Sequence, residues 1–295
     1  MSDSAAIATT GQVRATLREA RRQMRGLLRH RSIRVGGVLF GSIVLLAIFA
    51  DLIAPHDPNE NNYRAMLAAP GNGHLFGTDA FGRDILSRVI HGTRLSLLVG
   101  LMVVAATGIL GTVIGTLTGY VRWLDGPVMR VMDGLMAFPG VLLAIALAAA
   151  LGPSVVNAAL ALTITFTPRT ARIVRGSVLV VREMPFVEAA RACGAPHRRI
   201  ILRHILPNSL PPLIVQMTFV FSVSILAEAV LSFMGVGPPP PTPSLGNIIA
   251  EGRAYIQEAP WIALTPGVAI AMSVLGLNII GDGLRDSLDP RLRNL

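Results

Sequence analysis

Six long apolar stretches dominate this sequence and restrict what it can fold into. A helix needs roughly 20 mostly apolar residues to cross the hydrocarbon core of a bilayer, and backbone groups in lipid must find their hydrogen-bond partners within the helix itself. The stretches cover approximately residues 35–54, 95–120, 131–151, 154–168, 209–235 and 261–283. We therefore expect an all-α membrane protein with about six transmembrane helices.

The fourth stretch is too short to span a bilayer by itself. Beyond its apolar part come Arg169, Arg172 and Arg175, which are three residues apart. That spacing places the arginines on one face of a helix. We expect the helix to continue through them as it leaves the bilayer.

Charge is scarce in this chain and mostly positive. Only 15% of the residues are charged, against about a quarter in an average soluble domain, and the mean hydropathy is +0.58. The net charge of +9 comes from arginine, because the chain contains no lysine. A net charge of this size is also typical of proteins that bind nucleic acid. Here, however, the arginines flank the apolar stretches, as residues that determine membrane topology do. We expect a lipid bilayer as the partner, and no nucleic acid.

The distribution of arginine predicts the orientation, because cytoplasmic loops carry an excess of Arg and Lys. With the N-terminus inside, the inner segments hold 21 arginines and the outer segments five. We expect both termini inside. The expected parts are a basic tail over 1–34, a transmembrane domain over 35–285 with an external loop 55–94 and a cytosolic loop 176–207, and a C-terminal tail over 286–295.

The arginines of the N-terminal tail recur at helical spacing. This pattern is compatible with a basic amphipathic helix on the membrane surface. A solvated tail whose charge only fixes the orientation is the simpler interpretation, and we favour it.

Motifs for covalent chemistry are missing. A P-loop needs a lysine that reaches the nucleotide phosphates, and this chain has none. It also lacks the HExxH pair of metalloproteases and the GxSxG elbow of esterases. We expect no catalytic residue, no metal and no cofactor bound by this chain. Two other classes stay open: an intramembrane enzyme with an unrecognised catalytic pair, and a non-transporting scaffold for a soluble partner.

The arginine-rich loop 176–207 contains the pattern of two helices joined by a turn. The residues before Gly194 are good helix formers, Gly194 suits the end of a helix, and Pro196 suits the first turn of the next one. A helix followed by a glycine turn makes a compact projection. We expect this loop to dock on a soluble partner.

Six residues of this loop, at their spacing, resemble the EAA loop of ATP-binding-cassette (ABC) importer permeases. They are Glu188, Ala189, Ala190, Gly194, Leu206 and Pro207. In that family the loop inserts a coupling helix into a groove on each ATPase subunit. The resemblance therefore implies that these residues couple the chain to partner ATPase subunits. Those subunits, and not this chain, would bind ATP and Mg²⁺.

A second set of residues narrows the family further. The run 74–97, which begins His-Leu-Phe-Gly-Thr-Asp, resembles the signature of the C subunits of dipeptide and oligopeptide permeases. Those proteins also share the segments 137–139, 231–237, 241–243 and 281–290. The resemblance covers almost the whole chain except its N-terminal tail.

This resemblance implies a type I ABC importer permease fold in the bacterial cytoplasmic membrane. It also implies three kinds of partner: a homologous B-type permease that forms a heterodimer with this chain, one or two ABC ATPase subunits, and an extracytoplasmic peptide-binding protein. The implied function is uptake of dipeptides or oligopeptides. Members of the subfamily that carry nickel chelates, glutathione or haem are the alternative.

Several charged residues are expected to form structural ion pairs. Two pairs have the four-residue spacing that brings side chains together on a helix, and these are Asp79 with Arg83 and Asp84 with Arg88. Near the inner ends of two spans, Asp133 and Asp282 lie close in sequence to arginines, the latter to Arg285.

Glu228 lies well inside the fifth apolar stretch and has no charged neighbour in sequence. A charge inside the bilayer is expensive. The side chain must therefore be protonated, paired across helices or facing water. We keep two interpretations open, a place in the translocation path and a role in helix packing.

Overall fold

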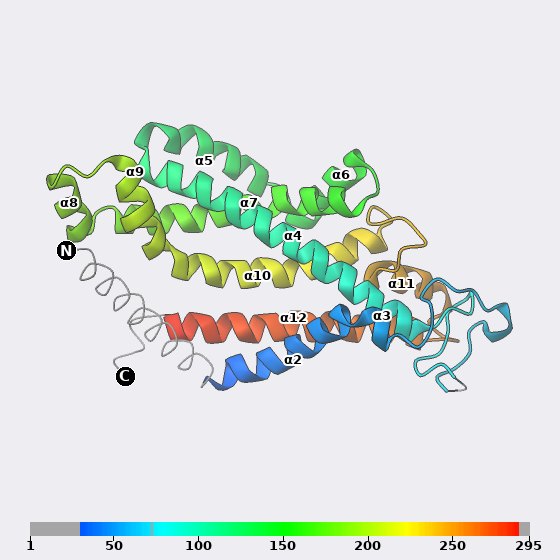
Figure 1. Ribbon diagram of the computed structural model, residues 1–295. Helices are drawn as coiled ribbons and strands as arrows, with labels where there is room; N and C mark the ends of the chain where they lie inside the picture. Colours follow the sequence, from blue (N-terminus) through cyan, green and yellow to red (C-terminus); the bar gives the residue numbers. More distant parts are fainter. Residues whose placement is uncertain (1–29, 72, 289–295) are drawn as a thin grey trace, which may run out of the picture.

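The computed structural model describes residues 30–71 and 73–288, and this part of the chain is almost wholly helical (Figure 1). Residues 1–29 of the basic tail, and with them the question of a surface helix, lie outside the described residues. In chain order the elements are α2 (Arg31–Ile48), α3 (Ala50–Ile53), the 3₁₀ turn η1 (Tyr63–Ala65), α4 (Ile85–Tyr120), α5 (Arg122–Met136), α6 (Gly140–Leu151), α7 (Val155–Val181), α8 (Pro185–Ala192), α9 (His197–Arg199), the π-helical turn η2 (Ile200–Ile205), α10 (Leu206–Phe233), α11 (Leu245–Gly252), the 3₁₀ turn η3 (Arg253–Tyr255) and α12 (Trp261–Leu288).

The long helices form an elongated bundle with two distinct ends. Helices α4, α7, α10 and α12 run along its length, and α2 lies beside α12 (Figure 1). Helices α8 and α9 lie at one end, which we call the α8 end (Figure 1). The loop between α3 and α4 lies at the other end together with α11, and we call this the α11 end (Figure 1). The expectation of an all-α protein is confirmed for the described residues.

Glycines permit the close contact between α4 and α7. Gly111, Gly115 and Gly119 are four residues apart on α4 and therefore share one face. A Cβ added to Gly115 would lie 2.5 Å from the carbonyl oxygen of Ala171, and one on Gly119 would lie 2.8 Å from Cβ of Val178. Small residues at this spacing let the backbones of membrane helices approach closely.

The third apolar stretch, 131–151, was expected to form one helix, but it is divided between two helices, α5 and α6. Helices α5 and α6 meet at an angle of 91°. Pro139 precedes the first residue of α6 with a ψ of 122°, which is not helical, and the residue before a proline is disfavoured in the helical conformation. The chain therefore turns at Phe138. Residues 122–130, which join the second and third apolar stretches, form the first part of α5.

Other boundaries also differ from those expected. Helix α4 begins at Ile85, ten residues before the second apolar stretch, because its first turns are buried at the α11 end. Helix α11 forms in a segment for which the sequence pattern predicted no helix. In contrast, α7 runs to Val181 and includes all three arginines that were expected to continue it.

Four helices of the described chain are long and apolar enough to span a membrane, and α5 with α6 would make a fifth if the bent pair is one span. Helix α7 has 27 residues, a length sufficient for a span, but its three arginines lower its apolar character. The expected number of about six spans stays a prediction.

Candidate functional site

The α8 end contains a helix that closes with a glycine turn. The backbone N–H of Ala195 donates to the carbonyl of Ala190, and that of Gly194 donates to the carbonyl of Arg191. These two bonds form a Schellman motif, which requires a left-handed residue after the helix. Gly194 has a φ of +74°. The expected helix end at Gly194 is thus confirmed.

One apolar residue anchors α8 to the bundle. Val187 is fully buried in a cluster with Val178 and Ile200, among others. The adjacent Glu188 and Ala189 are exposed, and Ala190 is half-buried. Because residues on successive positions of a helix point in different directions, burial of Val187 turns the carboxylate of Glu188 outward. One side of α8 therefore packs against the bundle, and its other side is exposed to solvent.

Beyond the glycine turn, the chain returns directly into the bundle. Pro196 caps α9, and the π-helical turn η2 joins α9 to α10 without a break. The hydroxyl of Tyr120 lies 2.6 Å from Nδ1 of His197 and ties this segment to the end of α4. Leu206 and Pro207 form the first turn of α10. The second short helix of the loop is therefore an extension of α10, and α8 is the part that projects at this end (Figure 1).

The α11 end contains a buried network of charges. Arg83 Nε donates to Asp79 over 2.6 Å, and Arg88 also donates to Asp79. Both arginines reach Glu251 of α11 over 2.7 Å. Asp79 and Arg88 are each only 1% exposed. The expected pair between Asp79 and Arg83 is confirmed, within a larger network that holds the α3–α4 loop against α11.

The expected pair between Asp84 and Arg88 is wrong. Asp84 is the N-cap of α4, and its Oδ2 accepts hydrogen bonds of 2.8 Å from both the backbone N–H and the hydroxyl of Ser87. Because Asp84 is occupied in this way, Arg88 pairs with Asp79 and Glu251 instead. Sequence reasoning missed Glu251, because 163 residues separate it from Arg88 and no local spacing connects them.

Two aspartates lie near the expected cytoplasmic ends of membrane spans, and only one of them forms an ion pair. Asp133 of α5 pairs with Arg172 of α7 over 2.5 Å, so its expected role in an ion pair is confirmed, with a partner from another helix. Asp282 of α12 is exposed. Among the described residues no ion pair joins it to Arg285, and that expectation is not confirmed.

Glu228 lies in the last two turns of α10 and is fully buried. The hydroxyl of Ser96 on α4 donates to its Oε2, and the hydroxyl of Ser232 donates to Oε1 over 2.7 Å. The four-residue spacing to Ser232 was visible in the sequence, whereas Ser96 was not predictable from spacing. This environment favours helix packing over a place in the translocation path.

Comparison with known proteins identifies the family of this chain. Residues 108–294 match the family described as the binding-protein-dependent transport system inner membrane component. Residues 18–70 match the N-terminal TM domain of oligopeptide transport permease C. The chain belongs to this permease family. The ABC permease resemblance of the sequence is thus confirmed.

Relatives of the permease cover almost its full length. A protein of Brucella abortus, provisionally named a peptide transport system permease protein, is 54% identical over 91% of each chain. The dipeptide transport system permease protein DppC of Alkalihalophilus pseudofirmus is 45% identical over 94% of this chain and 90% of its own. The inward-facing MetNI methionine ABC transporter matches the fold with a TM-score of 0.59 at 20% identity, over 70% of this chain and 98% of the other.

Proposed function

We propose that this permease is the C-type subunit of an ATP-driven peptide importer. The exposed face of α8 carries the proposal, because it presents Glu188, Ala189 and Ala190 beyond the body of the bundle. In this assignment α8 is the helix that receives the motion of ATPase subunits, and Gly194, Leu206 and Pro207 fix its place relative to α10. The chain carries out no covalent chemistry, and the partner subunits hydrolyse ATP with Mg²⁺.

The proposed orientation places the α8 end in the cytoplasm and the α11 end outside. The excess of arginine in the segments assigned to the inside supports it. In this orientation α8 faces the compartment that contains ATP. The loop 55–94 and α11 then face the compartment in which a binding protein delivers the ligand.

The proposed assembly contains a B-type permease that completes the translocation path, one or two ABC ATPases at the α8 end and a peptide-binding protein at the α11 end. ATP-driven closure of the ATPases would move α8 and, through the continuous η2–α10 segment, the core of the bundle. A ligand shifts such an equilibrium only if it binds the two states with different affinity. Alternating exposure of the path would follow from that difference.

The proposed ligand is a dipeptide or oligopeptide, and the names of the relatives support it. Affinity measurements on the associated binding protein with a panel of di- to oligopeptides test this part. Tight binding of peptides is the expected result. Selective binding of a nickel chelate, glutathione or haem instead would replace the substrate and leave the coupling role intact.

The test of the coupling role is Glu188→Ala in the assembled transporter. We expect peptide uptake and co-purification of the ATPase subunits to fall by about tenfold or more, as for a central contact of an interface. The matched control for ATPase co-purification is Glu258→Ala, because Glu258 is also exposed but belongs to the segment between η3 and α12. Unchanged ATPase association in Glu188→Ala would overturn the assignment.

A further inference from the structure

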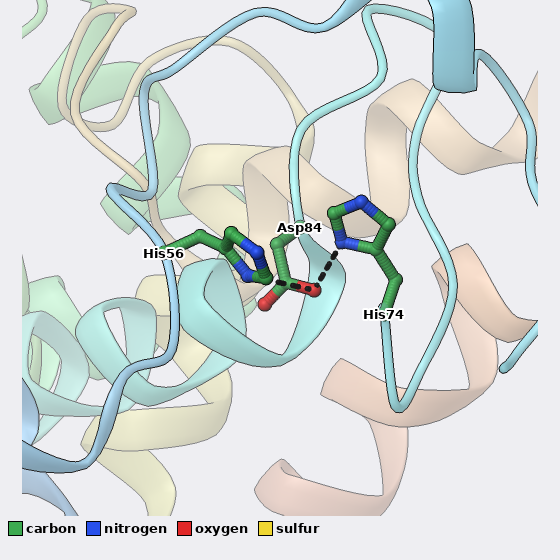
Figure 2. Close-up of side chains that lie close together, drawn as sticks. All are labelled: His56, His74 and Asp84. Carbon is green, nitrogen blue, oxygen red and sulfur yellow. Dashed lines mark hydrogen bonds and ion pairs between the residues drawn. The ribbon is translucent and has the colours of Figure 1, made fainter. Parts of the chain in front are cut away.

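Three potential metal ligands meet at the α11 end, where Asp84 lies between the rings of His56 and His74 (Figure 2). Oδ1 of Asp84 is 2.9 Å from Nδ1 of His74 and 3.8 Å from Nδ1 of His56. The two rings lie 4.7 Å apart between centroids. Two imidazole nitrogens and one carboxylate oxygen therefore lie within 4.8 Å of one another.

The carboxylate of Asp84 is held in a fixed orientation. Its Oδ2 is occupied by the two hydrogen bonds from Ser87, and the side chain has no exposed surface. These contacts direct Oδ1 toward the two imidazoles. Hydrogen bonds of this kind orient the ligands of metal sites and increase their affinity.

The backbones of both histidines are also fixed. The N–H of His56 donates to the hydroxyl of Ser87 over 3.1 Å, which connects it to the residue that orients Asp84. His74 exchanges two backbone hydrogen bonds with Gly71, of 2.8 and 2.9 Å. The three candidate ligands thus come from three separate segments, each held by contacts that do not involve a metal.

We propose that His56, His74 and Asp84 bind a divalent transition-metal ion, with Zn²⁺ as the ion that fits best. Neutral imidazole and carboxylate are ligands of Zn²⁺, at about 2.0–2.1 Å, and three protein ligands with one water complete a tetrahedral site. In that geometry the ligand atoms lie about 3.3 Å apart. The distances of 2.9 and 3.8 Å fall on either side of this value.

The surroundings leave room for the fourth ligand. The His56 side chain is 39% exposed, and beside it is a hollow lined by Asp51, Asp57 and His91, among others. Water therefore has access to the open coordination position. Short sequence motifs gave no reason to expect a metal here, because the ligands are separated by 18 and 10 residues along the chain.

A metal at this position would join the segment after α3, the turn at residues 71–74 and the start of α4. It would stabilise the α11 end independently of the docking of ATPases at the α8 end. The proposal does not depend on the nature of the transported ligand, and metal content is measured without transport.

The test uses the whole transporter, purified with a tag that contains no histidine, stripped with a chelator and dialysed against Zn²⁺. We expect the wild type to retain one more zinc ion per permease chain than the double variant His56→Gln/His74→Gln. Each single variant is expected to lower the affinity for zinc at least about tenfold, and Ser87→Ala is expected to lower it by about 10- to 100-fold through loss of ligand orientation. The matched control His91→Gln, a histidine of the same end that contacts Asp51, retains the zinc.

Substitution by Co²⁺ provides a readout of the ligand geometry in the wild type. Visible d–d absorption that disappears in His56→Gln supports the site, and the exposed His56 permits this variant even if His74→Gln fails to assemble. Equal zinc content in the wild type and the double variant would overturn the proposal. The three side chains would then be a hydrogen-bonded tie within the loop.

Discussion

The two ends of the bundle use charge in opposite ways. At the α11 end, Asp79, Arg83 and Arg88 are buried and bond to one another and to Glu251. At the α8 end, Glu188 is exposed on a helix that one valine anchors. A buried and paired charge fixes a structure, whereas an exposed charge beside small residues is available to a partner. Substitutions should therefore affect stability at one end and association at the other.

The largest loss of stability is expected from Arg88→Ala. Removing one partner of a buried charge network leaves the others uncompensated and costs about 3–5 kcal/mol. Denaturation of the purified transporter in detergent measures the change. The control is Arg94→Ala, because Arg94 is half exposed and pairs with the exposed Asp51, and exposed pairs contribute little. Equal loss in both variants would remove the distinction between buried and exposed charge.

A smaller loss of stability is expected from Gly194→Ala at the α8 end. A Cβ would meet no atom there, so the cost comes from the left-handed backbone alone, about 1–2 kcal/mol. Gly176→Ala in α7 is the matched control, since that glycine is helical and its Cβ would also meet nothing. The control is expected to retain or gain stability. A Gly194→Ala transporter as stable as the control would show that the turn is not required.

The smallest change of stability is expected from Glu188→Ala, within about 0.5 kcal/mol, as for an exposed residue without a structural role. The same variant is expected to lose association with the ATPases. Measuring denaturation and co-purification on one preparation separates the two effects. A large loss of stability in Glu188→Ala would place Glu188 in the same structural class as Arg88.

The sequence predicted those features that depend on local pattern. Apolar length predicted most of the long helices, and Gly194 predicted the end of α8. Hydropathy averages over a window, so it did not detect the 91° bend between α5 and α6, although Pro139 carries the reason for it. Likewise Asp84 has the residue type of an N-cap, and its capping role was visible in principle.

Contacts between distant segments were not predictable from one sequence. Glu251 bonds to Arg88 across 163 positions, and Ser96 bonds to Glu228 across 132 positions. The convergence of His56, His74 and Asp84 likewise depends on how the loop folds back on α4. Spacing rules identify partners within a helix, but the fold selects those between helices.

The chain contains a single cysteine, Cys193, which is exposed directly after α8. Its rate of modification by a maleimide, in the permease pair alone and in the permease pair with its ATPases, tests the docking of ATPases at this end most directly. We expect the ATPases to protect Cys193, and to leave unprotected a cysteine placed at the α11 end by Glu258→Cys in a Cys193→Ser background. Equal modification of Cys193 with and without ATPases would contradict the assignment of α8 as the coupling helix.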